Sequence, residues 1–266
     1  MLEVLQYDFI QNALIAGVLI SIAAGIIGSL VVVNKITFLT GGIAHSSYGG
    51  IGLAIYLGLP VLFGATVFAV LTAVIIAIIT LNNRNRIDAI IGMMWASGMA
   101  IGIIFVDLTP GYNVDLMSYL FGSIIAVSND DLIYMTALDI FIVSTVVFFY
   151  KQILAVSYDS EFATLRVIIV KFFYTLILIL AALCVVAAIK AVGLILVIAL
   201  LTIPTYLAES FASRLSTMML ISSILATIFT ILGLVVSYIY DISSGASIII
   251  VAVVILAFVK LLKFKR

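Results

Sequence analysis

Two polar side chains interrupt apolar stretches of the sequence, and they are the first candidates for chemistry. His45 is the only histidine of the chain. It follows Lys35 by about ten residues, or about 15 Å of helix rise, which places it deep in an apolar segment. A neutral imidazole binds borderline metal ions such as Zn²⁺ well. A histidine hydrogen-bonded between two helices is the equally favoured alternative. Small residues that would let a helix or a solute approach lie around it: Gly41, Gly42, Ser46 and Gly49.

Asp139 is the second polar interruption. It lies between Leu138 and Ile140, well inside a segment long enough to cross a membrane. A carboxylate in hydrocarbon is costly, so it faces water, pairs with a hydroxyl group or carries a proton. A structural role is favoured over a role in solute binding, although both stay open.

The sequence contains no motif of an enzyme. It has no H-E-x-x-H, no G-x-S-x-G and no P-loop. An intramembrane enzyme would also need a nucleophile or second ligand at suitable spacing from His45. We therefore predict a transport subunit without catalytic residues, and any ATP hydrolysis that drives transport would occur in a separate chain.

The composition shows what solvent surrounds these residues. Of 266 residues, 66% are hydrophobic and only 9% are charged, against about 25% charged residues in soluble domains. Lipid is the solvent that such a chain requires, and we predict an all-α, polytopic helical bundle. The net charge of zero gives no reason to expect nucleic acid as a partner, and the single cysteine, Cys184, excludes an intramolecular disulfide. Met1-Leu2-Glu3 lacks a basic region, so no cleavable signal peptide is expected.

Apolar runs separated by charged, Gly or Pro residues predict about eight or nine transmembrane helices. Their ranges are 12–33, 43–59, 61–81, 88–106, 132–150, 167–189, 193–208, 217–238 and 246–260. With Lys35 on the cytoplasmic side, alternating loops place eleven of the twelve Lys and Arg residues there, and Lys190 is the exception. This asymmetry predicts an external N-terminus and a cytoplasmic C-terminus.

Two segments are too polar or too short to cross the membrane. Segment 107–131 contains Asp107, Pro110 and Asp115, and its apolar part, Met117 to Val127, is shorter than the about 20 residues of a span. We expect an external loop with a short interfacial or re-entrant helix. Segment 151–166 is the longest predicted cytoplasmic loop, and it could dock a short helix onto a partner.

Five sequence motifs, in order, make the chain resemble the membrane permeases of ABC importers for zinc, manganese and iron. The family has a motif like G-D-A-L-S-H-A-x-x-x-G-V-A, and residues 40–52 here read TGGIAHSSYGGIG. The other matches are DLMSYLFG at 115–122, DSEFA at 159–163, VGL at 192–194 with the run to Ile203-Pro204, and SYIYDISSGA at 237–246. The likeness extends over nearly the whole chain.

The resemblance implies one transmembrane permease domain over 1–266 with the fold of type II ABC importers, in a prokaryotic-type cell (inner) membrane. It implies a homodimer around a central path, two cytoplasmic ATPase subunits and an external solute-binding protein. His45 would handle the metal, with Asp139 as a second candidate on the path. The ATPase would meet Asp159, Glu161 and Phe162, and the binding protein would meet the external loop with Asp107 and Asp115.

One position departs from the family motif. The family's aspartate, four residues before the histidine, falls on Gly41. An aspartate and a histidine at this spacing share a helix face and can share a metal. A path poorer in oxygen ligands suits Zn²⁺ better than Mn²⁺. We therefore expect zinc first, or manganese or iron, carried as substrate and not held as a cofactor. The alternatives are a permease for chelated iron or cobalamin, and a secondary transporter driven by an ion gradient.

Overall fold

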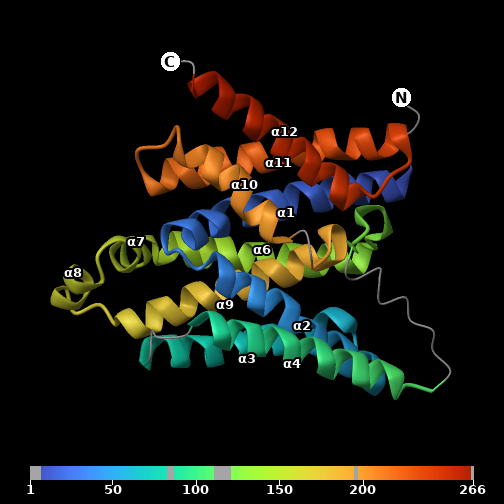
Figure 1. The fold of residues 1–266 in the computed structure, drawn as a ribbon, viewed down its shortest axis with the longest axis horizontal. Coiled ribbons are helices and arrows are strands. Elements are labelled where there is room, and N and C mark those ends of the chain that lie inside the picture. The colour runs from blue at the N-terminus through green and yellow to red at the C-terminus, as the bar shows by residue number, and fades with distance from the viewer. Residues whose placement is uncertain (1–6, 83–86, 111–120, 195–196, 265–266) are drawn as a thin grey trace. The chain divides into compact units, whose positions relative to one another are not determined.

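The chain folds into α-helices throughout the part that the structure describes. The structure is a computed structural model, and it describes residues 7–82, 87–110, 121–194 and 197–264. No strand occurs in these ranges. The helices, drawn in Figure 1, are α1 (Asp8–Val33), α2 (Thr37–Leu57), α3 (Val61–Asn82), α4 (Ile87–Asp107), η2 (Ile124–Ala126, a 3-10 helix), α6 (Asn129–Phe148), α7 (Tyr150–Tyr158), α8 (Ser160–Leu165), α9 (Val170–Val192), α10 (Val197–Glu209), α11 (Leu215–Tyr240) and α12 (Ser244–Phe264).

Each predicted transmembrane segment overlaps mainly with one helix, so the prediction of an all-α, polytopic bundle is confirmed. Within the described ranges, seven helices are long and apolar enough to cross a membrane: α1, α3, α4, α6, α9, α11 and α12. The other two predicted spans became α2 and α10. Helix α10 has 13 residues, about 20 Å of rise, which is less than the about 30 Å of hydrocarbon in a bilayer. The estimate of eight or nine spans is therefore approximate.

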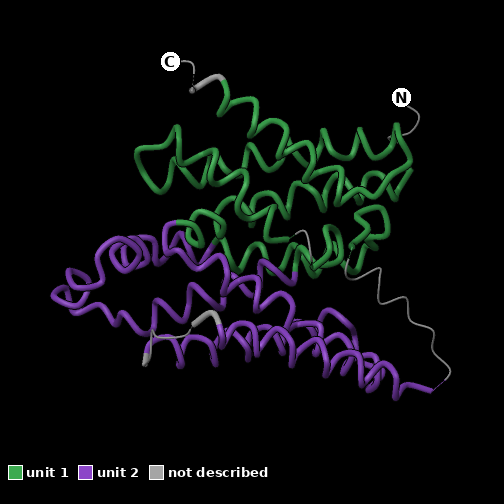
Figure 2. Tube along the Cα trace, viewed as in Figure 1, with its two compact units in different colours: residues 1–32, 117–143, 187–266 green, residues 33–116, 144–186 purple. Residues whose placement is uncertain are grey.

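The chain divides into two compact units, which Figure 2 colours separately. Unit 1 contains the described residues of 1–32, 117–143 and 187–266, and unit 2 those of 33–116 and 144–186. Helices α6 and α9 contribute to both units. His45 belongs to unit 2 and Asp139 to unit 1.

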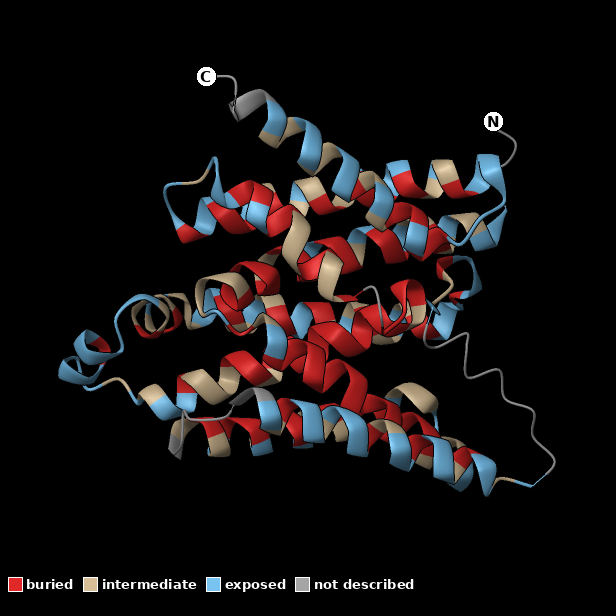
Figure 3. Ribbon diagram, viewed as in Figure 1, coloured by how far each residue is buried: buried red, intermediate tan, exposed pale blue. Residues whose placement is uncertain are grey.

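In unit 2, helix α2 packs against both α3 and α4. It is buried along most of its length (Figure 3). The turn from α2 to α3 is as short as the sequence predicts. Gly58 ends α2 with a positive φ of 67°, where its backbone N–H bonds to the carbonyl oxygens of Ala54 and Ile55. Pro60 directly precedes α3, a favourable position because proline supplies no N–H there.

Glycines bring α2 into backbone contact with its two neighbours. A Cβ atom added to Gly50 would lie 2.2 Å from the carbonyl oxygen of Gly64 on α3. One added to Gly52 would lie 2.2 Å from the carbonyl oxygen of Gly102 on α4. Membrane helices associate through such small residues because lipid provides no hydrophobic drive between helices. The small residues of α2 thus fix the position of the helix that carries His45.

Unit 1 uses small and hydroxyl residues in the same way. A Cβ atom on Gly28 of α1 would lie 2.2 Å from the carbonyl oxygen of Leu201 on α10. The buried hydroxyl groups of Thr205 (α10) and Ser222 (α11) share a hydrogen bond of 2.7 Å. Such bonds satisfy polar groups that have no water to bind inside a membrane.

Candidate functional site

His45 is buried in the middle of α2, with 6% of its surface exposed. Its imidazole ring lies nearly parallel to the indole ring of Trp95 on α4, with ring centroids 3.7 Å apart and an angle of 9° between the planes. Nδ1 of His45 has no hydrogen-bond partner among the described residues. The histidine is therefore not held between two helices by a hydrogen bond at Nδ1, and this nitrogen keeps its capacity to bind a ligand.

Trp95 is held in place from both sides along α4. Its Nε1–H donates to Sδ of Met99 at 3.2 Å. One residue before Trp95, the carbonyl oxygen of Met94 accepts a hydrogen bond of 2.8 Å from the Ser46 hydroxyl on α2. Sequence reasoning missed Trp95, although it is the only tryptophan of the chain.

The small residues around His45 serve helix packing within unit 2. A Cβ atom on Gly42 would lie 2.7 Å from Cγ2 of Ile91, and one on Gly49 would lie 2.9 Å from the carbonyl oxygen of Gly98. Ser46 is used in the bond to α4 described above, and Gly41 is buried within α2. Their role in lining a path stays a prediction.

Asp139 lies on the buried face of α6, where it is 5% exposed. Met135 precedes it by one turn and Ile142 follows it by one turn, and both are fully buried. Neither carboxylate oxygen has a hydrogen-bond partner among the described residues. A buried carboxylate without a partner is expensive, so its presence calls for a functional explanation.

No described residues form a complete metal site. Within the ranges that the structure describes, no three His, Cys, Asp or Glu side chains lie close enough together to hold a metal ion. His45 and Asp139 belong to different units. His45 and Asp139 could thus each contribute a single ligand within their own unit.

The predicted coupling segment forms two short helices, α7 and α8, that meet at Asp159. The Asp159 carboxylate caps α8, since its Oδ1 accepts a hydrogen bond of 2.9 Å from the Phe162 backbone N–H. Glu161 and Phe162 are exposed, and the Arg166 guanidinium lies 5.3 Å from the centre of the Phe162 ring. An open groove between the helices is lined by Lys151, Leu154, Ala155, Tyr158, Asp159 and Phe162.

Of the two predicted external docking residues, Asp107 lies in the described part of the chain. Asp107 is exposed and is the last residue of α4. Asp115 lies outside the described residues. The following stretch, 121–128, contains the single turn of η2, in which Ile124 is fully buried.

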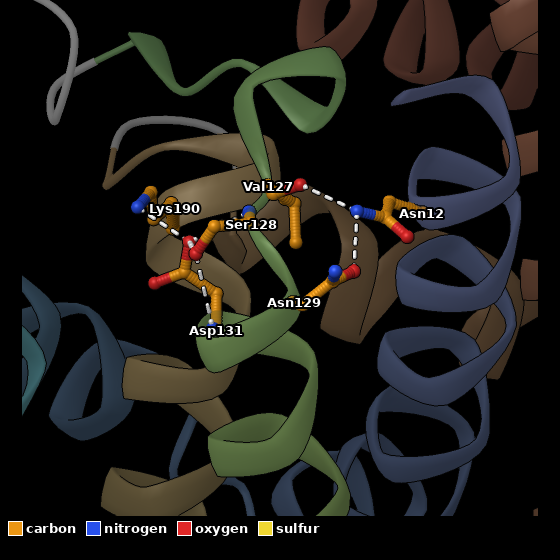
Figure 4. Close-up of polar contacts among 6 residues, drawn as sticks. All are labelled: Asn12, Val127, Ser128, Asn129, Asp131 and Lys190. Carbon is orange, nitrogen blue, oxygen red and sulfur yellow. Dashed lines mark hydrogen bonds and ion pairs between the residues drawn. The ribbon is translucent and has the colours of Figure 1, made fainter. Parts of the chain in front are cut away.

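A polar cluster that sequence reasoning missed lies where α6 begins, within unit 1 (Figure 4). The Lys190 ammonium at the end of α9 lies 2.5 Å from Oδ2 of Asp131. The same oxygen accepts hydrogen bonds from the backbone N–H of Ser128, at 2.8 Å, and from its hydroxyl, at 2.6 Å. Lys190 is the one basic residue that charge counting places outside, and this exception was the available signal.

Asn12 of α1 extends this cluster. Its side-chain amide donates to the carbonyl oxygen of Val127 at 3.3 Å and to Oδ1 of Asn129 at 3.0 Å. The Ser123 backbone N–H donates to the carbonyl oxygen of Lys190 at 3.0 Å. The segment that leads into α6 is thereby tied to both α1 and α9.

Comparison with known proteins adds to the geometry. The model of the ABC 3 transport family matches residues 6–263. An uncharacterized membrane protein of Synechocystis is 44% identical over 266 residues, which cover 100% of this chain and 94% of that protein. The manganese transport system membrane protein MntC of Halalkalibacterium halodurans is 32% identical over 94% of this chain and 86% of its own length. The solved structure of PsaBC from Streptococcus pneumoniae in complex with a Fab has a TM-score of 0.86 and 32% identity, covering 95% of this chain and 91% of that chain.

The apolar helical bundle, its likeness to PsaBC and the family match together define a membrane permease of the ABC transporter type. The chain belongs to the ABC 3 transport family. The resemblance seen in the sequence is thus confirmed. The chain is a transport subunit and not an enzyme, and ATP hydrolysis belongs to a separate subunit.

Proposed function

We propose that this chain is the membrane-spanning subunit of an ATP-driven importer of divalent metal ions. The observation that carries the proposal is the single buried imidazole on α2, whose Nδ1 has no partner among the described residues. It lies in the motif by which the chain resembles metal permeases, and the manganese transport protein MntC is 32% identical over most of the chain. Cytoplasmic ATPase subunits and an external solute-binding protein complete the proposed importer.

Manganese becomes the first candidate substrate. The missing carboxylate at Gly41 favoured zinc, but MntC of Halalkalibacterium halodurans, which matches 94% of this chain, is a manganese transport protein. Oxygen ligands suit Mn²⁺ and imidazole suits Zn²⁺, and the chain offers one candidate of each kind, Asp139 and His45, in separate units. A competition assay tests which ion the importer prefers. Excess Mn²⁺ should suppress uptake of labelled Zn²⁺ more strongly than excess Zn²⁺ suppresses uptake of labelled Mn²⁺. The opposite order would return zinc to first place.

The functional test is uptake by the complete importer in liposomes. With the ATPase and the binding protein present, the chain should support ATP-dependent Mn²⁺ uptake, and His45→Ala should abolish it without loss of assembly. Uptake that follows an ion gradient without ATP would favour a secondary transporter. ATP hydrolysis by the purified chain alone would contradict the proposal.

His45 and Asp139 are the proposed ligands of the path. Each chain contains one histidine, so the proposed homodimer would present two imidazoles. The buried carboxylate of Asp139, which has no partner among the described residues, is a separate candidate ligand in the other unit. Chemical crosslinking of the assembled importer, followed by mass measurement, should give two copies of this chain. A single copy of this chain in an active importer would contradict a path to which two His45 side chains contribute.

The proposed contact with the ATPase is the segment from α7 to α8. The exposed Phe162 side chain and the open groove that it lines offer a surface for a partner, and the neighbouring Glu161 is also exposed. The double variant Glu161→Arg, Phe162→Ala should release the ATPase from the purified complex. Phe172→Ala on α9 is the control, since this phenylalanine is 52% exposed, against 46% for Phe162, but lies outside the segment. An intact complex in the double variant would reject the placement.

The proposed orientation places α8 in the cytoplasm and the start of α6 outside. Two exposed carboxylate residues allow a direct test: Asp130 at the start of α6 and Glu161 in α8. Asp130→Cys should react with a membrane-impermeant thiol reagent in intact cells, whereas Glu161→Cys should react only after the membrane is opened. The native Cys184 is buried and gives little background. The reverse labelling pattern would invert the topology.

A further inference from the structure

The only tryptophan of the chain lies flat against its only histidine. We propose that Trp95 is a positioning residue: its indole ring fixes the plane of the His45 imidazole so that one ring nitrogen faces the metal ion. The inference rests on the proposed role of His45 in metal transport. It adds a residue that does not itself bind the metal.

The geometry of the stack is compatible with Trp95 orienting the His45 ring. With centroids 3.7 Å apart and 9° between the planes, the indole covers one face of the imidazole. The lone pairs of imidazole nitrogens lie in the ring plane, so a ring on the face does not block metal binding. It does block rotation of the imidazole about its bond to Cβ, because a rotated ring would collide with the indole.

His45 needs such support. A metal-binding histidine is normally oriented by a hydrogen bond from its second ring nitrogen to a carboxylate, a carbonyl group or water. Nδ1 of His45 has no such partner among the described residues, and Gly41, one turn earlier, has no side chain to provide one. The stack on Trp95 is the ring contact that the structure shows for His45 among the described residues, and it fixes the ring plane.

Trp95 itself is placed with precision. The bond from its Nε1–H to Met99 fixes the outer edge of the indole. On the inner side, α2 and α4 touch directly: a Cβ atom on Gly98 would lie 2.5 Å from Cα of Ser46. Together with the bond from Ser46 to Met94, these contacts hold α4 against α2 on both sides of Trp95. The indole itself is 36% exposed, so its bond to Met99 and its stack on His45 hold it in place, and not burial.

A single tryptophan makes the test spectroscopic. Mn²⁺ is paramagnetic, and its binding at His45 should quench Trp95 fluorescence saturably in the purified chain in nanodiscs. His45→Ala should remove the saturable component. Absence of saturable quenching at Mn²⁺ concentrations that support uptake would overturn the inference, because it would separate Trp95 from the metal.

Uptake kinetics provide the second readout. Trp95→Leu removes the aromatic plane and should raise KM for Mn²⁺ by about tenfold, the usual effect of losing an orienting partner, with little change in the maximal rate. Trp95→Phe keeps a ring and should restore KM to near the wild-type value. A merely structural role would instead lower the amount of assembled importer and leave KM unchanged.

The outcomes separate this inference from the proposed function. If His45→Ala is inactive while Trp95→Leu has a normal KM, only the positioning role is overturned. If His45→Ala transports Mn²⁺ normally, the proposed function of His45 fails, and the inference fails with it. Should Trp95→Leu not fold, the saturable quenching of the wild-type protein and its loss in His45→Ala still test whether Trp95 lies beside the bound ion.

Discussion

The Lys190 ammonium lies 2.5 Å from Oδ2 of Asp131, and both groups are largely shielded from solvent. The pair joins the last turn of α9 to the first turn of α6 (Figure 4). Two hydrogen bonds from Ser128 reach the same carboxylate oxygen. Lys190, which departs from the charge asymmetry of the other basic residues, therefore serves to neutralise a shielded carboxylate at a helix junction.

Lys190→Met should destabilise the chain. The substitution keeps a long side chain but leaves the Asp131 carboxylate shielded without its cation, which costs about 1–3 kcal/mol or more. The melting temperature of the protein in detergent should fall accordingly.

The double variant Lys190→Met, Asp131→Asn tests the origin of this cost. It removes both charges and should recover part of the lost stability, because no uncompensated charge remains. If the double variant melts below Lys190→Met, the ion pair does not explain the effect.

The glycines of α4 provide a matched pair of substitutions. Gly98→Ala should lower stability, since its Cβ atom would lie 2.5 Å from the Ser46 backbone, and overpacking costs about 1–3 kcal/mol. Gly92→Ala on the same helix meets nothing within 4 Å, and it should be neutral or stabilising by up to about 1 kcal/mol. Thermal melting of both variants checks the difference, and equal melting temperatures would deny the close packing of α2 on α4.

The sequence predicted the helices well and their contacts poorly, for physical reasons. Long apolar runs must become helices in lipid, and Gly58 with Pro60 marks a tight turn, so the elements followed from local patterns. The stack of Trp95 on His45 and the ion pair of Lys190 with Asp131 join distant segments. Such pairs depend on helix packing, which composition does not encode.

For the candidate site, too, the sequence identified individual residues better than their contacts. The sequence singled out His45 and Asp139 because polar groups are rare in apolar spans, and the structure finds both buried with atoms that lack partners among the described residues. The small residues near His45 gave a less specific signal. Glycine and serine look alike whether they face a solute or a neighbouring helix, and Gly42, Ser46 and Gly49 contact neighbouring helices.

Asp159 should matter for coupling through its role as the cap of α8. Asp159→Ala removes the acceptor of the Phe162 N–H and should cost about 0.5–2 kcal/mol locally. Loss of this cap would loosen α8 and weaken binding of the ATPase. Asp159→Ser keeps a capping oxygen and should bind the ATPase almost as well as the wild-type chain. Copurification of the ATPase with each variant measures the effect, and equal loss in both would point to the charge of Asp159 and not to the cap.

Substitution of Asp139 should have opposite effects on stability and on transport. Its carboxylate oxygens have no hydrogen-bond partner among the described residues, so the folded chain bears the cost of burying them. Asp139→Leu should therefore raise the melting temperature, because it removes a desolvation cost of about 1–3 kcal/mol. If the carboxylate binds the passing ion, the same variant should lose Mn²⁺ uptake while it still assembles with the ATPase.

Asp139→Asn is the companion variant, because it keeps the shape and removes the charge. Uptake should fall with Asp139→Asn as it does with Asp139→Leu, since an amide oxygen is a weaker ligand for Mn²⁺ than a carboxylate. Ile142→Val, one turn along the same buried face, controls for repacking and should lower stability by about 0.5–1.5 kcal/mol while uptake persists. Normal uptake by Asp139→Asn would remove Asp139 from the path. A lower melting temperature for Asp139→Leu would instead indicate a contact that holds the carboxylate in the folded importer.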